Sequence, residues 1–185
     1  MKTIHIFTLF IIVALIQLFV PAQVILKQES VLETGHAYKF KTQPIDPNDP
    51  FRGKYITLNY AISSIKTKDS LWKRNEPLFV YLKIDSLGYA KIDTVSRQQI
   101  LKKDNDYCMA KVRWYSKYDN TLNIDFAFKR YYMEETKAYD AEVAVRIRQR
   151  DSLLDNTHAL VYVKEGEAVL SDVIIDNISI KNYVE

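Results

Sequence analysis

The sequence predicts an α+β fold: a mainly antiparallel sheet or open barrel with one packed helix, preceded by one N-terminal transmembrane helix. Three observations lead to this fold class. Residues 4–26 are almost continuously apolar. Several later segments alternate apolar and polar side chains, which is typical of half-buried antiparallel strands. Residues 134–150 contain neither Gly nor Pro and run from acidic to basic, an order that suits a helix dipole.

The apolar run at residues 4–26 is long enough to cross a hydrocarbon core of ~30 Å at ~1.5 Å rise per residue. Two interpretations compete. A cleaved signal peptide requires a small-x-small cleavage site, but Val20 replaces one of the small residues before a cut at Ala22. We therefore favour an uncleaved anchor in contact with membrane lipid. Lys2 on the short side indicates a cytoplasmic N-terminus and a domain outside the cytoplasm.

The chain divides into three predicted parts. Residues 1–26 form the transmembrane anchor or signal peptide, residues 27–35 a linker, and residues 36–185 a strand-rich globular domain. The linker is polar and suits a short continuation of the helix that ends at Gly35.

Alternation predicts which side chains form the core of the domain. The predicted core rows are Ile56, Leu58, Tyr60 and Ile62; Leu78, Val80, Leu82 and Ile84; Cys108, Ala110, Val112 and Trp114; Leu122, Ile124, Phe126 and Phe128; and Ala159, Val161 and Val163. A further strand is expected at 169–175, and turns at 85–88, 118–120 and 165–167. Cys108 is the single cysteine, so it forms no internal disulfide and is expected to be a buried, inert thiol.

Charge and motifs exclude several function classes. The chain has 26 basic and 23 acidic side chains with the signs interspersed, so it lacks the basic stripe of a nucleic-acid binder. The three histidines have no partner at metal-ligand spacing. There is no Gly-x-Ser-x-Gly elbow and no glycine loop for phosphate. The sequence therefore predicts no catalytic residue, no metal site and no cofactor.

The densest polar cluster surrounds three prolines at residues 44–55. It favours a rigid turn braced by carboxylates and a guanidinium, and the alternative is a presented binding loop. In the strand that follows, Leu58 and Tyr60 are expected to face the core with Ile56, and Tyr55 the opposite side. The candidate binding residues are Asp46, Asp49, Arg52, Tyr55 and Tyr60.

The stretch from Asp46 to Tyr60 resembles the signature of the GDYXXLXY protein family. Gly53, Tyr55, Leu58 and Tyr60 match the name-giving pattern, whereas Lys54 replaces its acidic residue. An N-terminal anchor, residues 128–135 before a helix, and closing strands follow the same order as in the family. The resemblance implies a bacterial, membrane-anchored protein of a kind often encoded beside multi-spanning membrane proteins. It supplies no catalytic residues.

Two function classes follow. The leading hypothesis is an extracytoplasmic interaction or accessory module for an integral membrane protein partner. The alternative is a small-molecule or envelope-polymer binding domain that uses the 13 tyrosines, because the Tyr ring is amphipathic and favoured at binding surfaces. A hydrolase is a third possibility, which a deep pocket with two perturbed carboxylates would favour.

Overall fold

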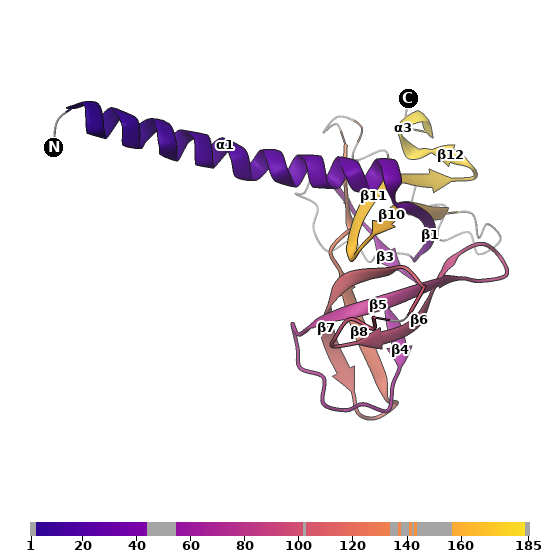
Figure 1. Cartoon of the computed structure of the whole chain (residues 1–185). Coiled ribbons are helices and arrows are strands. Elements are labelled where there is room, and N and C mark those ends of the chain that lie inside the picture. The colour runs from indigo at the N-terminus through magenta and orange to yellow at the C-terminus, as the bar shows by residue number, and fades with distance from the viewer. Residues whose placement is uncertain are drawn as a thin grey trace.

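The computed structural model describes residues 3–43, 55–101, 103–133, 137, 141, 143 and 157–183. In this part of the chain one long helix, α1 (Thr3–Thr34), leaves a domain of antiparallel strands (Figure 1). The strands form a nearly closed, barrel-like arrangement, so the predicted fold class is confirmed.

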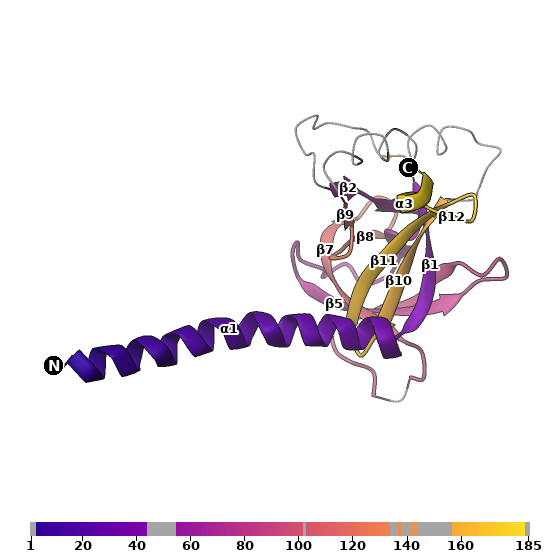
Figure 2. The same ribbon diagram turned by 90° about the horizontal axis from the view of Figure 1, so that it is seen from above.

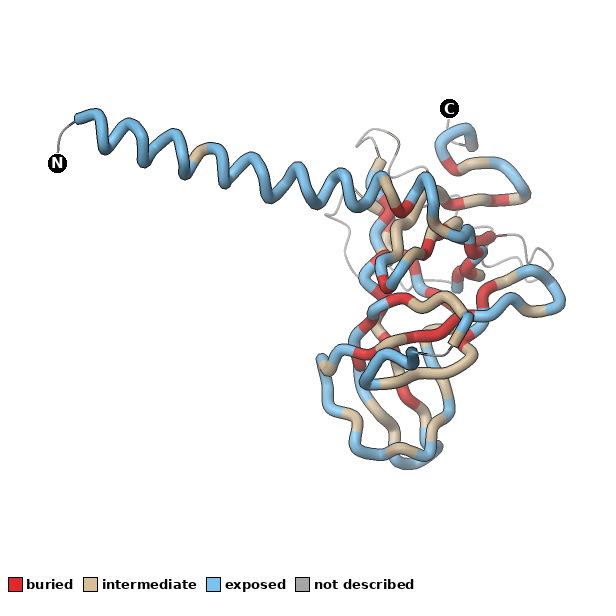
Figure 3. The backbone as a smooth tube through the Cα atoms, viewed as in Figure 1, coloured by how far each residue is buried: buried red, intermediate tan, exposed pale blue. Residues whose placement is uncertain are grey.

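Helix α1 crosses the predicted anchor and the predicted linker without a break. Its apolar part projects from the domain with its side chains exposed (Figure 3), and it is long and apolar enough to span a membrane. Pro21 lies inside the helix. The polar residues after Leu26 continue the helix to Thr34, and the amide of Gly35 donates to the carbonyl of Val31 at 2.9 Å.

The last turns of α1 are attached to the domain. Val31 is buried there, and the helix lies against two strands, β10 (Thr157–Lys164) and β11 (Glu167–Ile175). Lys27 forms an ion pair with Glu167. Lys164 donates to the hydroxyls of Thr34 at 2.7 Å and Ser30 at 3.2 Å. The helix therefore enters the domain as a fixed element.

Two five-stranded sheets and one two-stranded sheet make up the domain (Figure 2). The first sheet has the order β12 (Ile178–Ser179), β11, β10, β1 (His36–Gln43), β3 (Asn59–Tyr60). The second has the order β4 (Ser64–Lys66), β8 (Thr121–Phe126), β7 (Tyr107–Ser116), β5 (Pro77–Ile84), β6 (Ala90–Ser96). Strands β2 (Tyr55–Thr57) and β9 (Arg130–Tyr132) pair separately, and a short helix, α3 (Ile180–Tyr183), follows β12.

Backbone hydrogen bonds join the two large sheets on both sides. On one side, the turn after β3 bonds to β1 through Ala61 and to β8 through Ser63, at 3.0 and 2.8 Å. On the other side, Gly166 at the β10–β11 turn accepts from the amide of Met109 in β7 at 2.8 Å. Gly166 has φ +91°, and a Cβ there would lie 2.9 Å from the ring of Tyr107. This close approach explains why the turn predicted at 165–167 contains glycine.

The core agrees with the alternation pattern over most of its length. The buried members of the predicted rows are Ile56, Leu58, Tyr60, Leu78, Val80, Leu82, Cys108, Ala110, Val112, Leu122, Ile124, Phe126, Phe128, Ala159, Val161 and Val163. Cys108 is completely buried, and burial raises the pKa of its thiol to about 12. The expectation of a buried thiol at this position is therefore confirmed, and its inertness stays a prediction.

Two predicted core residues, Trp114 and Ile84, are exposed instead. In β7 the register shifts between Val112 and Trp114, which moves Trp114 out of phase with the buried row. In β5 Tyr81 is buried although it lies on the opposite face from the predicted row, and Ile84 lies at the strand end beside the hairpin turn.

The predicted helix at 134–150 lies mostly outside the described residues. Lys137, Ala141 and Val143 are described and are helical, and Ala141 is buried in the core. No core row was predicted for strands β1 and β6. In β1 the buried residues Tyr38, Phe40 and Thr42 do alternate, so period two was a usable signal there.

We expect the domain to fold without the apolar part of α1, because its contacts with the helix lie in the last turns. A chain trimmed to residues 34–185 should unfold cooperatively. A chain trimmed to 27–185 should be more stable by about 1.5–3 kcal/mol, the value of burying one apolar side chain such as Val31. Thermal melting followed by circular dichroism compares the two. A 34–185 chain without a cooperative transition would contradict the division at this point.

Candidate functional site

The segment 55–60, called the motif strand below, changes its pairing partner in its middle. At its start, β2 pairs with β9, so that Tyr55 lies opposite Tyr132 and Thr57 opposite Arg130. The amide of Leu58 then donates to the carbonyl of Lys129 at 2.7 Å, after which β3 pairs with β1. The segment 55–60 therefore links the small sheet to the first large sheet.

One side of this strand belongs to the core, as predicted. Tyr60 is 2% exposed, and its ring packs edge-on against Phe40 with centroids 5.3 Å apart. Its hydroxyl donates to the carbonyl of Phe128 at 2.6 Å. Burial raises the pKa of Tyr60 well above its usual range. Tyr60 thus secures the motif strand to the segment before β9 and presents no surface to a ligand.

The opposite side of the strand carries a surface cluster of Tyr55, Arg130 and Tyr132, named the Tyr55 cluster below. The Tyr55 and Tyr132 ring centroids are 5.4 Å apart, and the Arg130 guanidinium carbon lies 4.9 Å from the Tyr55 ring. Tyr132 is 64% exposed. Exposed tyrosines beside an arginine are typical of the residues that dominate protein interfaces.

The remaining candidate residues, Asp46, Asp49 and Arg52, lie outside the described residues. The described part of the chain resumes at Tyr55, where β2 begins. The loop therefore adjoins the Tyr55 cluster along the chain, and its role as a rigid turn or a binding loop stays a prediction.

Behind the Tyr55 cluster, Tyr131 points the other way and ties β9 to the first sheet. Its hydroxyl donates to Asp172 at 3.1 Å, and Asp172 also accepts from the amide of Val173 at 2.8 Å. Burial, reinforced by the Asp172 carboxylate, raises the pKa of Tyr131. Of the two adjacent tyrosines of β9, Tyr131 is buried and holds β9 to the first sheet, whereas Tyr132 is exposed at the surface.

A second cluster surrounds Arg97, at the end of β6. Its guanidinium pairs with Asp69 and, at 2.8 Å, with Glu76, and it lies 4.0 Å from the centre of the Trp72 ring. Asp69 and Glu76 also accept the backbone amides of Leu71 and Lys73. The hydrogen bond from Arg97 lowers the pKa of Asp69, and the amide of Lys73 lowers that of Glu76.

A shallow recess of about 400 Å³ lies beside this cluster. It is lined by Thr67, Asp69, Trp72, Val95, Ser96, Arg97 and Gln98. Both carboxyl pKa values of the cluster are shifted in the same direction, which does not separate a general acid from a general base.

A third cluster lies where β1 leaves α1. Asp106 accepts from the Tyr38 hydroxyl at 2.9 Å, and the same carboxylate oxygen lies 2.7 Å from Nδ1 of His36. Burial and the Asp106 carboxylate raise the pKa of Tyr38. The cluster ties the first residues of β1 to the loop before β7. No group of His, Cys, Asp or Glu in the described part of the chain has the arrangement of a metal site.

Sequence spacing did not bring these clusters together. His36 and Asp106 are far apart along the chain, as are Trp72 and Arg97, and only the sheet register makes them neighbours. Arg130 and Tyr132 carried one usable signal, since they belong to the segment 128–135 that entered the family resemblance.

These features define a class of protein: a strand-rich, nearly closed barrel carried on one long apolar helix, with an aromatic and cationic cluster on its motif strand. The chain belongs to the GDYXXLXY protein family, whose model matches residues 17–173. The match extends from the middle of α1 into β11 and includes the motif strand. No curated protein and no solved structure matches the chain.

The two tyrosines of the motif are expected to respond differently to loss of the hydroxyl. Tyr60→Phe leaves the buried carbonyl of Phe128 without its donor, which should cost ~1–3 kcal/mol of unfolding free energy. Tyr55→Phe, on the surface, should change stability by less than ~0.5 kcal/mol. Urea unfolding at neutral pH measures both.

Comparison of Tyr60→Phe with the wild type also tests how the unfolding free energy depends on pH. The raised pKa of Tyr60 means that its neutral form stabilises the fold. That stabilisation is complete below about pH 10, the pKa of a tyrosine in an unfolded chain, and is lost as the pH rises toward the higher folded value. Tyr60→Phe should therefore lose less stability at alkaline pH than the wild type, with Tyr38 and Tyr131 supplying the rest of the loss. An identical alkaline loss in both proteins would contradict a core role for the Tyr60 hydroxyl.

Proposed function

We propose that this chain is a membrane-anchored, extracytoplasmic interaction or accessory module for an integral membrane protein partner. The observation that carries the proposal is the continuity of α1 with the domain. A helix long and apolar enough to span a membrane passes directly into β1, with its last turns bonded to β10 and β11.

The exposed apolar part of α1 supports the anchor. Large hydrophobic side chains cover the helix from Ile4 to Leu26 and are exposed along it. An apolar surface of this extent in a protein chain requires lipid or a protein partner. The first charged side chain after this run is Lys27, which suits the boundary between the bilayer and water.

The attachment of the helix supports a partner in the same membrane. Lys27, Ser30, Val31 and Thr34 all contact or bond to the domain, so helix and domain move together. Such a domain presents a constant face at a constant height above the bilayer. Confinement of two proteins to one membrane raises their effective concentration, so a modest interface is sufficient for association.

The Tyr55 cluster is the proposed contact surface. It combines two tyrosines, whose rings are tilted at 60° to each other, with a guanidinium, and Tyr132 is 64% exposed. The candidate residues Asp46, Asp49 and Arg52 precede Tyr55 in the sequence and remain candidate contact residues of the proposed interface. A tyrosine and arginine centre with a polar rim is the usual composition of a specific interface.

A second candidate function is favoured by the recess beside Arg97. Its lining combines an indole with the hydroxyl of Ser96 and the amide of Gln98. Aromatic and polar groups of this kind suit a polyhydroxylated ligand such as an envelope polymer or a small molecule. Arg97 itself is engaged by Asp69 and Glu76, so its role there is to hold the wall of the recess.

The side of the membrane is tested with reporters fused to the C-terminus of the full chain. We expect alkaline phosphatase, which is active only outside the cytoplasm, to be active. A reporter that works only in the cytoplasm should be silent at the same position. The reverse pair of results would refute the extracytoplasmic placement.

The contact surface is tested with a photo-crosslinking residue at Tyr132 in the full chain in its native membranes. The matched control is the same residue at Tyr118, a fully exposed tyrosine in the β7–β8 turn. We expect a defined adduct with an integral membrane protein from position 132 only. Arg130→Ala should weaken that adduct about ten-fold or more, as loss of an interface hot spot does. Equal adducts from both positions would count against the Tyr55 cluster.

A further inference from the structure

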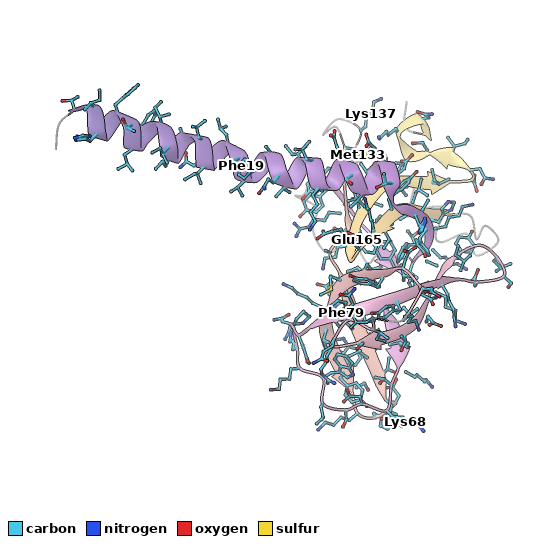
Figure 4. All side chains as sticks on the ribbon, viewed as in Figure 1. Phe19, Lys68, Phe79, Met133, Lys137 and Glu165 are labelled. Carbon is cyan, nitrogen blue, oxygen red and sulfur yellow. The ribbon has the colours of Figure 1, made fainter. Side chains whose placement is uncertain are left out.

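The segment between β4 and β5, residues 67–76, extends across the second sheet toward the side from which α1 leaves the domain. Figures 1 and 2 both show this, because the start of β5 lies toward the N-terminal end of α1 in each view. Figure 4 labels Lys68 near the far end of the segment and Phe79 just beyond its near end. The segment and α1 therefore approach the same side of the molecule at two separate places.

The exposed side chains of this segment combine an apolar residue with several cations. Leu71 is 77% exposed, and Lys68, Lys73 and Arg74 are exposed around it. The two acidic residues, Asp69 and Glu76, both pair with Arg97, and the three cations of the segment outnumber them. The surface that the segment offers is thus cationic, with a leucine in its centre. This composition matches the boundary between lipid headgroups and acyl chains.

Hydrogen bonds hold the segment in one conformation, so the exposed side chain of Leu71 has a defined position on the surface. Its amide is bonded to Asp69 at 2.9 Å, and the amide of Asn75 donates to the carbonyl of Val112 at 2.8 Å. Arg97 covers the Trp72 ring and bonds to the segment at both ends. A preformed surface loses little conformational entropy when it binds.

The position of the bilayer follows from α1. Its apolar run ends at Leu26, so the membrane surface lies at about Lys27, where the helix begins to contact the domain. A domain fixed to the helix at this point faces the bilayer with the side from which the helix leaves. The end of the segment 67–76 that enters β5 lies on that side (Figures 1 and 2).

We propose that the part of this segment next to β5 forms a second membrane contact, in which Leu71 enters the headgroup and acyl boundary while Lys73 and Arg74 meet lipid phosphates. This inference rests on the proposed membrane span of α1. It adds a fixed orientation: two contacts with the bilayer prevent the domain from rotating about the helix axis.

The test uses the full chain in nanodiscs that contain lipid and no other protein. A nitroxide spin label is attached at Leu71→Cys, and its accessibility to oxygen and to a water-soluble nickel complex is measured. The matched control is Leu87→Cys, since Leu87 has the same 77% exposure but lies in the β5–β6 turn. Ile16→Cys reports on the helix itself. The native Cys108 is completely buried and is not expected to react.

In bilayers with anionic lipid we expect the Leu71 label to favour oxygen over nickel, as the Ile16 label does, and the Leu87 label to favour nickel. Lys73→Gln together with Arg74→Gln should weaken the association of this segment with the bilayer, by about five-fold for each charge removed near an anionic surface. A Leu71 label as accessible to nickel as the Leu87 label, with Ile16 in lipid, would overturn the second contact and leave the anchor intact. A nickel-accessible Ile16 label would refute the anchor and the contact that rests on it.

Discussion

The arrangement of the whole protein depends on the close approach of helix α1 to strand β10 at Gly35. A Cβ at this position would lie 2.4 Å from the carbonyl oxygen of Val31 and 3.0 Å from that of Val163, so any other residue would force the helix and the strand apart. The next residue, His36, begins β1, which pairs with β10 on one side and β3 on the other. Since β1 lies inside the first sheet, helix α1 is joined to an inner strand of that sheet, and the position of the helix relative to the domain follows from that joint.

Much of this fold was predictable because alternation with period two survives wherever a strand stays regular. The rows through Leu122 and Val161 are buried as expected. The pattern failed at Trp114, because a register shift after Val112 adds one residue to the strand and reverses the faces beyond it. A bulge depends on how the partner strand fits, and nothing in the local pattern of apolar residues indicates it. The polar residues after Leu26 were compatible with a linker and with a short continuation of the helix, and the structure shows the helix continuing to Thr34.

The candidate site was predictable only where it follows from one strand. Opposite faces for Tyr55 and Tyr60 follow from strand geometry, and the structure places one on the surface and the other in the core. The arginine beside Tyr55 comes from β9, and the pairing of β2 with β9 joins segments that are distant in sequence. Likewise His36 meets Asp106, and Arg97 meets Trp72, only after the barrel is formed. Motif spacing contains no information about such pairs, because tertiary contacts determine them.

The rigid joint between α1 and the domain has a mechanical consequence. The apolar run of the helix is slightly longer than the ~30 Å thickness of an average hydrocarbon core, and a helix that exceeds this thickness tilts. With a flexible connection the tilt would end at the water boundary. Lys27, Val31 and Lys164 fix the helix to the barrel, so in the proposed membrane orientation the tilt would be transmitted to the domain as a rotation. A local change in bilayer thickness would then displace the end of the domain that lies farthest from the helix.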